Sequence, residues 1–396
     1  MTCANPSDIL SSIARKYLRL STAANVGPIR VRNLVEHLGS VDAVLEASVA
    51  ELQQVDQVGR KSAEAIFAAR SNAEAVEREI HRAAECNLRI LCPEDDDYPK
   101  PLRNIPDPPI CLYVRGTLEP ADAVAIAIVG TRRCSHYGRE QAMRFGELLA
   151  RAGFTVVSGL ARGIDGFAHR GAIRGGGRTL AVLGNGLAAI YPPDHLELAK
   201  EIAANGAVVT ELPIDTSPDA KNFTARNRII TGLSLGVLVI EAPLTSGALI
   251  TARLASEYNR EIFALPGNVD RPDLNAGSNA LIRDGGAKLV TCLEDVLDEL
   301  KDVGRIMRRG SDAIEPPGSS PTSPPSGGSP GGRPQLARLS DAQRAVFDAI
   351  HDGAEQLDSV CERTELAAGV VTSAVTSLEL VGLVRQLPGG RVVLRA

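Results

Sequence analysis

The chain contains no tryptophan, and aromatic residues make up only 3% of its 396 residues. A protein that stacks many successive bases of a nucleic acid needs a row of exposed rings. The composition therefore argues against an extended base-stacking surface, although one or two stacking rings are compatible with it. Basic residues are not in excess either, because 43 Lys and Arg stand against 48 Asp and Glu, a formal net charge of −5. Any binding of a polyanion must come from a local basic cluster.

The seven cysteines are scattered, and none forms a C-x-x-C pair. An odd number without such spacing argues against a disulfide framework and a zinc knuckle and favours reduced thiols. Long hydrophobic runs are missing as well. The N-terminus lacks the apolar core of a signal peptide, and no run approaches the roughly 18 apolar residues of a membrane span. We expect a cytoplasmic protein with no membrane contact, no metal and no cofactor.

The patterns along the chain predict five parts. Residues 1–90 place apolar residues at helical spacing, and residues 91–122 form a proline-rich connector. Residues 123–305 alternate strands and helices, which is typical of a parallel sheet covered on both faces. Residues 306–337 are rich in Pro, Gly and Ser and predict a disordered linker. The order of helices followed by a hairpin in residues 338–396 predicts a winged-helix domain.

The predicted fold class is α/β, a Rossmann-like, doubly wound and mostly parallel sheet between a helical module and the winged helix. Strands are predicted at Val124–Val129, Thr155–Ser158, Thr179–Leu183, Ala207–Thr210, Gly236–Ile240, Glu261–Ala264 and Lys288–Val290, and the last helix of the sheet domain at Ser278–Asp284. Ligands of such sheets lie beyond the carboxyl ends of the strands. Small and polar residues follow several of these strands, where helix N-termini favour an anion. The sequence therefore predicts a phosphate-binding crevice at this edge.

Two segments of the helical module, Ala24–Gly39 and Leu52–Arg70, each place a glycine between two amphipathic patterns. They resemble the helix-hairpin-helix (SAM-like) module, whose glycine turn donates backbone N–H groups to a DNA phosphate. The usual turn has two glycines, whereas Asn25 and Gln57 stand here at the first glycine position. Contact with DNA and a purely structural helical hairpin are both compatible with this pattern.

The winged-helix region leaves a similar choice open. Its predicted recognition helix, Gly369–Val381, carries no Lys or Arg, so that few phosphate contacts are available to it. Residues Pro388–Gly390 are the predicted wing turn. Binding of DNA and a protein-interaction or vestigial role are both possible readings.

Six consecutive blocks of the sheet domain resemble the signature blocks of the DprA (Smf) family, the DNA-processing proteins of natural transformation. They are AIVGTRRCSHYG, VVSGLARGIDGFAH, TLAVLGNGLAAIYP, FTARNRIITGLS, VIEAPLTSGALITARLASE and FALPGNVDRPDLNAGSNALIRDGGAKLV. The helical module, the connector and the winged-helix tail are similar to those of the longer members. One departure is Gly130-Thr131-Arg132, where the family often has Gly-Ser-Arg.

The resemblance implies a protein that binds single-stranded DNA, protects incoming strands and loads the RecA recombinase. It also implies a homodimer formed through the Rossmann-like domain, with no catalysis as its main role. The alternative from another class is a nucleotide N-glycosidase related to the phosphoribohydrolases, which have a similar sheet. Their signature is P-G-G-x-G-T-x-x-E, but this chain has Pro243–Gly247 there, and Thr251 and apolar residues replace the glutamate.

The candidate site combines backbone N–H groups, a few cations and one ring, as a single strand requires. Ser158, Gly159 and Gly163 would offer N–H groups to a phosphate, or would serve tight packing between strand and helix. Ser246 and Gly247 begin another helix and leave the same two alternatives. The full set of candidate residues for single-stranded DNA or phosphate is Gly130, Thr131, Arg132, Ser158, Gly159, Arg162, Gly163, Lys221, Phe223, Arg226, Asn227, Arg228, Ser246 and Gly247.

The densest basic cluster surrounds Phe223, which we expect either to stack on a base or to anchor the core. Lys221 and Arg226 are the expected phosphate partners in this cluster. Arg226 and Arg228 face different directions on a helix, so one of them would instead pair with Glu211 or Glu241 inside the fold.

Asp165 and His169 lie one helical turn apart and would be either metal ligands or an acid/base pair. No third potential metal ligand stands at a spacing that would bring it close to these two residues. We therefore interpret Asp165 as a charge at a helix N-terminus, with His169 bonded to it.

Overall fold

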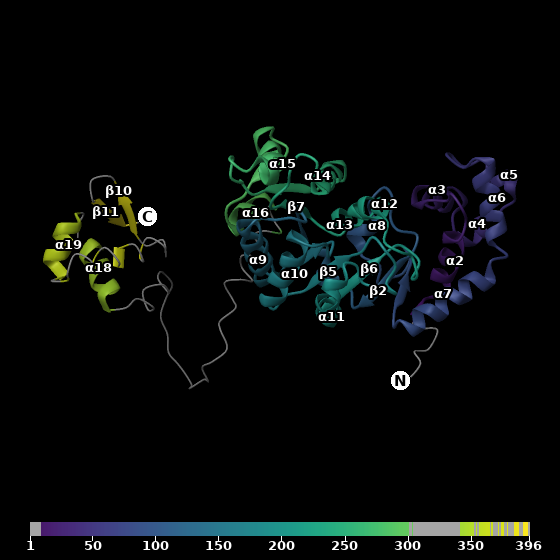
Figure 1. Cartoon of the computed structure of the whole chain (residues 1–396), viewed down its shortest axis with the longest axis horizontal. Helices are drawn as coiled ribbons and strands as arrows, with labels where there is room; N and C mark the ends of the chain where they lie inside the picture. Colours follow the sequence, from purple (N-terminus) through teal and green to yellow (C-terminus); the bar gives the residue numbers. More distant parts are fainter. Residues whose placement is uncertain are drawn as a thin grey trace, which may run out of the picture. The chain divides into compact units, whose positions relative to one another are not determined.

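The computed structural model describes residues 9–300, residue 303 and, with gaps, residues 341–394. The chain divides into two compact units, Met1–Pro316 and Pro317–Ala396 (Figure 1). The predicted linker, the predicted wing turn and most of the predicted recognition helix lie outside the described residues. The two units are therefore described separately.

A nine-stranded sheet forms the centre of the described part of the first unit, in the order β1-β2-β6-β5-β4-β3-β7-β8-β9. Each pair of neighbouring strands among β3 to β9 is parallel. Their bounds are β3 Ala125–Val129, β4 Thr155–Ser158, β5 Thr179–Val182, β6 Gly206–Thr210, β7 Gly236–Val239, β8 Glu261–Ala264 and β9 Lys288–Leu289. All seven strands predicted from the sequence are confirmed, each end within one residue.

The proline-rich connector contributes more structure than the sequence predicts. Strand β2 (Leu112–Gly116) pairs antiparallel with β6, and β1 (Arg89–Leu91) pairs antiparallel with β2. The short helices α8 (Lys100–Arg103) and η1 (Pro120–Ala123) complete this segment. Residues 89–116 therefore extend the sheet on one side, and the predicted boundary between helical module and connector falls within β1.

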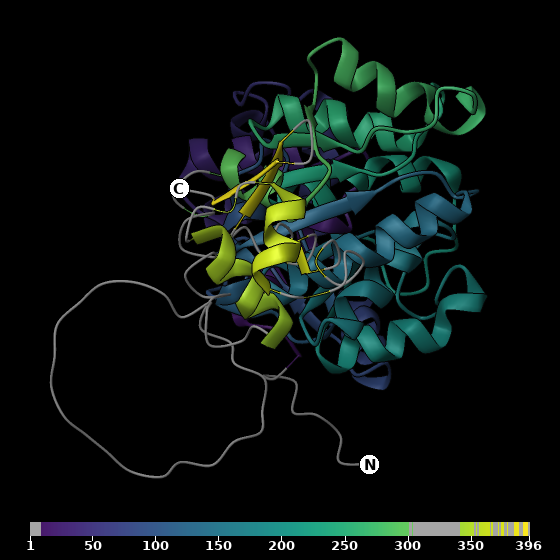
Figure 2. The same ribbon diagram turned by 90° about the vertical axis from the view of Figure 1, so that its left-hand side faces the viewer.

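Helices cover both faces of the sheet, as Figures 1 and 2 show. On β3, Ile126 and Ile128 pack into one core with Phe145, whereas Ala127 and Val129 pack into another. The helices are α9 (His136–Arg151), α10 (Ile164–Arg174), α11 (Leu196–Ala204), α12 (Ala220–Ala225), α13 (Asn227–Gly232), α14 (Gly247–Glu257), α15 (Pro272–Arg283) and α16 (Leu293–Glu299), with the short η2 (Pro193–His195). This alternation confirms the doubly wound α/β prediction.

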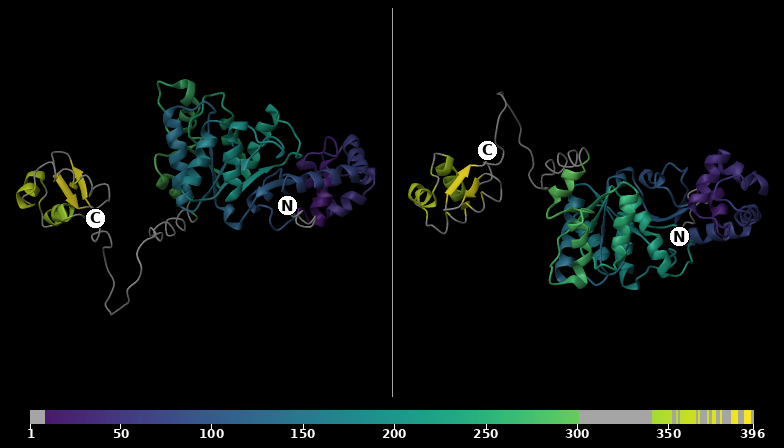
Figure 3. Two further views of the ribbon diagram at one scale, coloured as in Figure 1. Left: turned by 60° about the horizontal axis from the view of Figure 1, so that its bottom comes forward. Right: turned by 90° about the horizontal axis from the view of Figure 1, so that it is seen from above.

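The N-terminal module is helical, as predicted, and lies beside the β1–β2 end of the sheet (Figure 3). Its helices are α2 (Ser12–Ser21), α3 (Pro28–Leu38), α4 (Val41–Glu46), α5 (Val49–Leu52), α6 (Arg60–Ala69) and α7 (Ala73–Glu85). Asn25 and Gln57 adopt φ of 61° and 62°, the left-handed conformation that a glycine adopts most easily. Arg30 donates to the carbonyl oxygens of both residues, at 2.7 and 2.8 Å. The two turns are therefore tied together despite the missing first glycines.

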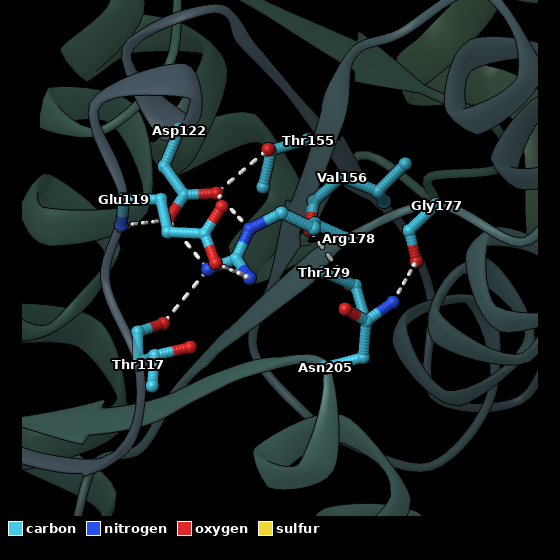
Figure 4. Close-up of polar contacts among 9 residues, drawn as sticks. All are labelled: Thr117, Glu119, Asp122, Thr155, Val156, Gly177, Arg178, Thr179 and Asn205. Atoms are coloured by element: carbon cyan, nitrogen blue, oxygen red, sulfur yellow. Dashed lines mark hydrogen bonds and ion pairs between the residues drawn. The ribbon is translucent and has the colours of Figure 1, made fainter.

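An ion-pair network lies at the amino ends of the central strands of the sheet (Figure 4). The guanidinium of Arg178 donates to both carboxylate oxygens of the buried Asp122 at 2.9 Å, and it also pairs with Glu119. Thr155, the first residue of β4, donates to Asp122 at 2.8 Å. Hydrogen bonding to Asp122 raises the pKa of Arg178. The network joins η1 to the starts of β4 and β5. It therefore lies at the opposite end of the strands from the predicted crevice.

In the described part of the second unit, α18 (Asp341–His351) and α19 (Leu357–Thr364) precede a hairpin of β10 (Val384–Leu387) and β11 (Arg391–Leu394). Phe347, Val360, Leu378 and Val392 are among the buried residues of one small core. This arrangement confirms the predicted winged-helix domain. Among the described helices of the whole chain, none is long and apolar enough to cross a membrane.

Candidate functional site

A cavity of about 670 Å³ opens beyond the carboxyl ends of β3 and β7. The chain runs from β3 through β4, β5 and β6 on one side and then crosses to β7 on the other side of β3. This reversal makes the β3–β7 junction the switch point of the sheet, where ligands of such folds bind. The lining residues are Val129, Gly130, Thr131, Arg132, Arg133, Ala161, Asp165, Tyr191, Pro218, Ala220, Phe223, Thr224, Arg226, Asn227, Ile230, Pro243, Ser246, Gly247, Ala248 and Thr251.

Eight of the fourteen candidate residues line this cavity, and two of them, Arg226 and Asn227, are buried. The other six are exposed or half-buried: Gly130, Thr131, Arg132, Phe223, Ser246 and Gly247. Arg132 and Arg133 are exposed, and neither forms an ion pair with another residue of the described chain. The Arg132 guanidinium carbon lies 5.4 Å from the centroid of the Phe223 ring. Three arginines and one carboxylate stand among the described lining residues, so that the cavity favours an anion.

Arg226 forms part of the cavity floor, and its side chain is only 6% exposed. It donates to the Val182 carbonyl at 2.9 Å and lies 3.7 Å from a carboxylate oxygen of Asp165. Burial lowers the pKa of Arg226 and raises the pKa of Asp165. The negative charge of Asp165 opposes the lowering for Arg226, and the positive charge of Arg226 opposes the raising for Asp165. Contrary to the prediction of a phosphate partner, Arg226 is mainly engaged by the protein.

Arg228 does not line the cavity. It is buried, with an ion pair to Glu211 and a contact of 3.4 Å to Asp107. The prediction that one of Arg226 and Arg228 pairs with Glu211 or Glu241 is confirmed for Arg228. Its prediction as a DNA contact is wrong for this structure, because both acids already neutralise it.

The turn after β4 is filled by the protein's own carboxylate. Asp165 accepts backbone hydrogen bonds from Gly159 at 3.2 Å and Ala161 at 3.3 Å. The hydroxyl of Ser158 is wholly buried and donates to the Ile128 carbonyl at 2.7 Å. The prediction of a phosphate nest at Ser158 and Gly159 is therefore corrected, since Asp165 takes the N–H of Gly159 and the Ser158 hydroxyl bonds inside the sheet.

Gly163 and Arg162 support neighbouring loops. Gly163 has φ of 79°, and a Cβ there would lie 2.4 Å from the Thr131 carbonyl oxygen. Arg162 donates two hydrogen bonds to Asp194, at 2.9 and 2.6 Å. Neither residue lines the cavity, and neither does Lys221, which is exposed on α12. The packing alternative for these glycines is the one that the geometry favours.

His169 does not bond to Asp165, which corrects the prediction. Its Nδ1 lies 2.7 Å from the Thr179 hydroxyl, which donates its own hydrogen to the Val156 carbonyl. His169 Nδ1 must therefore be the donor in this pair. Burial, with nearby positive groups, lowers the pKa of His169 to about 3. The ring is neutral at physiological pH, and the described residues contain no cluster of three or more potential metal ligands.

Two positions near the cavity were not among the site residues predicted from the sequence, Tyr191 and Glu241. Tyr191 is 40% exposed in the cavity wall. Glu241, buried after β7, accepts from Ser135 N at 2.9 Å and fixes the start of α9. The signal for Tyr191 was its place next to Pro192 at the end of the block TLAVLGNGLAAIYP.

Residues 89–301, which contain the whole sheet, match the family model of the DNA recombination-mediator protein A. This match covers more than half of the 396 residues. The chain belongs to this family. Residues 17–70 match the model of the SAM-like helix-hairpin-helix tandem, and residues 330–390 match that of the DprA winged helix domain. The predicted membership of the DprA/Smf family is confirmed.

Relatives extend along nearly the entire chain. Protein Smf of Synechocystis sp. is 36% identical over 390 residues, covering 95% of this chain and 97% of the relative. Protein Smf of Escherichia coli is 36% identical over 383 residues, covering 96% and 95%. The X-ray structure of DNA processing protein A from Streptococcus pneumoniae is 32% identical with a TM-score of 0.64, and covers 72% of this chain and 97% of that one. The domain content of the DprA/Smf family is thus shared from the hairpin module to the winged helix.

Proposed function

We propose that the chain binds single-stranded DNA in the cavity at the β3–β7 switch point and acts as a recombination mediator. In this role it protects incoming strands during natural transformation and loads the RecA recombinase, without catalysing a reaction. The observation that carries the proposal is the pair of exposed arginines, Arg132 and Arg133, in a cavity that also holds an exposed and a half-buried ring, within a DNA recombination-mediator fold. Smf and DNA processing protein A, to which the chain is similar, give the biological setting.

The wall opposite the rings suits a phosphate. Ser246 caps α14, and a Cβ at Gly247 would meet nothing within 4 Å. The start of this helix therefore stays open to an anion, in contrast to the turn that Asp165 fills. A second cavity of about 620 Å³ shares Thr131, Arg133 and Pro243 with the first and adds Arg271, which pairs with Asp273 of the same lining. Among the described residues, Arg133 is therefore the unpaired cation that the two cavities share.

The glycosidase alternative needs a carboxylate that can polarise water. Asp165 is the carboxylate among the described lining residues, and two backbone N–H groups and Arg226 already engage it. Thr251 lies where that class of enzyme has its glutamate. These contacts support a binding protein, and an assay of nucleoside monophosphate hydrolysis tests the alternative directly.

Fluorescence anisotropy with a labelled oligonucleotide, single-stranded or duplex, tests the proposal over a salt series. We expect preference for the single strand, and a loss of about 10-fold or more in affinity for Arg132→Ala, because a charge-assisted contact disappears. The slope of log K against log salt should also become shallower by about 0.7. Lys200→Ala, at an exposed position outside the cavity, is the matched control. Equal weak binding of both forms of DNA would contradict the proposal.

A further inference from the structure

Tyr191 is an exposed ring at the mouth of the cavity. The largest buried aromatic residues of the described chain, such as Tyr98 and Tyr113, are less than 2% exposed, whereas Tyr191 is 40% exposed. Its ring centroid lies 5.5 Å from that of Phe223, with 37° between the ring planes. A ring left open to solvent beside a basic cavity is available to stack on a ligand.

The loop that carries Tyr191 is anchored on both sides. Before it, the fully buried Asn185 donates to the carbonyl of Ala189 at 2.8 Å. After it, His195 Nδ1 lies 2.9 Å from the Leu160 carbonyl, and Asp194 pairs with Arg162. The ring is therefore positioned by the protein before any ligand arrives, which lowers the entropy lost on binding.

Phe223 is less available for stacking than Tyr191. It is half-buried, and a Cβ at Gly184 would lie 2.7 Å from Phe223 Cδ1, so that the backbone covers this part of the ring. Tyr191 and the Arg132 guanidinium approach the ring as well. The geometry is that of a supporting ring, with Tyr191 toward solvent.

We propose that Tyr191 is the base-stacking residue of the single-strand site, supported by Phe223, with Arg132 beside the stack to receive the phosphate. The inference rests on the proposed function and names the part of the DNA that this wall recognises, the face of one unpaired base. Every base has such a face, so the contact discriminates little between sequences.

Measuring the affinity of several protein variants for two DNA probes separates a stacking role of Tyr191 from a structural one. The probes are a labelled oligothymidylate and an oligonucleotide of the same length with abasic sites, and the proteins are the full-length wild type, Tyr191→Leu and Tyr191→Phe. Tyr191→Leu should weaken binding of oligothymidylate by about 5-fold or more, because base–aromatic stacking is lost. Its affinity for the abasic probe should equal that of the wild type. Tyr191→Phe should bind both probes as the wild type does, since the ring is kept.

Tyr137→Leu is the matched control, because Tyr137 is also 40% exposed but does not line this cavity. It should leave both affinities unchanged. An equal loss for both probes in Tyr191→Leu would overturn the proposal in favour of a structural role. Unchanged binding of oligothymidylate would overturn it as well.

A second readout uses the absence of tryptophan from the chain. In Tyr191→Trp, excitation of tryptophan reports this position alone, and stacking on a base should quench the emission on addition of oligothymidylate. The abasic probe should leave the emission unchanged. If the wild type shows no single-strand binding, the proposed function itself fails; if it binds while Tyr191→Trp shows no quenching, only the stacking assignment fails.

Discussion

At Gly159, the guanidinium of Arg226 occupies the space in which a Cβ would lie. An added Cβ would sit 1.5 Å from Arg226 Nη1, and the buried guanidinium is bound to Val182 and Asp165. Gly159→Ala should therefore lower the free energy of unfolding by about 1–3 kcal/mol, as overpacking of a core does. Urea denaturation followed by circular dichroism measures this change.

The control for that substitution is Gly247→Ala, because a Cβ at Gly247 has open space around it. It lies at the start of α14, where alanine is tolerated in a helix at least as well as glycine. The stability of this variant should stay within about 0.5 kcal/mol of the wild type. Equal stability of both variants would mean that Arg226 moves aside in Gly159→Ala.

The burial of His169 predicts that the free energy of unfolding depends on pH. Its pKa is lowered from 6.5 to about 3 by burial, so that between these values the unfolded chain binds a proton that the folded chain does not. The stability that His169 contributes is thus present above pH 6.5 and is lost as the pH falls. His169→Asn keeps an N–H donor for Thr179 but does not titrate. From pH 7 to pH 5, the wild type should lose about 2 kcal/mol more than this variant, which urea denaturation at each pH measures; parallel losses would contradict the buried neutral ring.

At the scale of the element, the inner strands β3 to β7 were predictable because burial on both faces leaves nearly unbroken apolar runs. Strands β1 and β2 were not predicted, since they flank a segment dense in turns and prolines. Helix α15 begins at Pro272, six positions before the predicted start at Ser278, because proline at the first turn fits a helix. Local patterns therefore identify elements well and their edges less well.

The candidate site was predictable as a place and only partly as a set of contacts. Gly130, Arg132 and Ser246 follow strand ends or begin helices, Phe223 stands in a basic cluster, and the topology brings them together. The roles of other residues depend on partners distant in the sequence. Arg228 meets Asp107, 121 positions away, and no local spacing indicates such a pair. Asp165, by contrast, fills the turn after β4 from only four to six positions away, so that this contact was local and was still missed.

At the scale of the whole molecule, the two edges of the sheet differ. The β1 edge lies against the helical module, because Leu88 and Ile90 belong to the same core as α2 and α7. At the other edge, both residues of β9 are exposed, and Leu289 is 43% exposed. Within the described part of the chain, β9 pairs with β8 alone, and such a strand edge with an exposed leucine favours pairing with another chain. The proposed homodimer through the Rossmann-like domain therefore has a suitable surface at β9.

Leu289→Glu tests this assignment in the full chain. A charge at each copy of a symmetric interface meets its own equivalent, so like charges and lost apolar contact should dissociate the dimer. Light scattering after gel filtration should give twice 41.8 kDa for the wild type and 41.8 kDa for Leu289→Glu. Ile29→Glu, at a residue 44% exposed on the helical module, is the matched control and should remain dimeric. A dimer that persists in Leu289→Glu would place the interface elsewhere, whereas a monomer with intact single-strand binding would show that each copy carries a complete cavity.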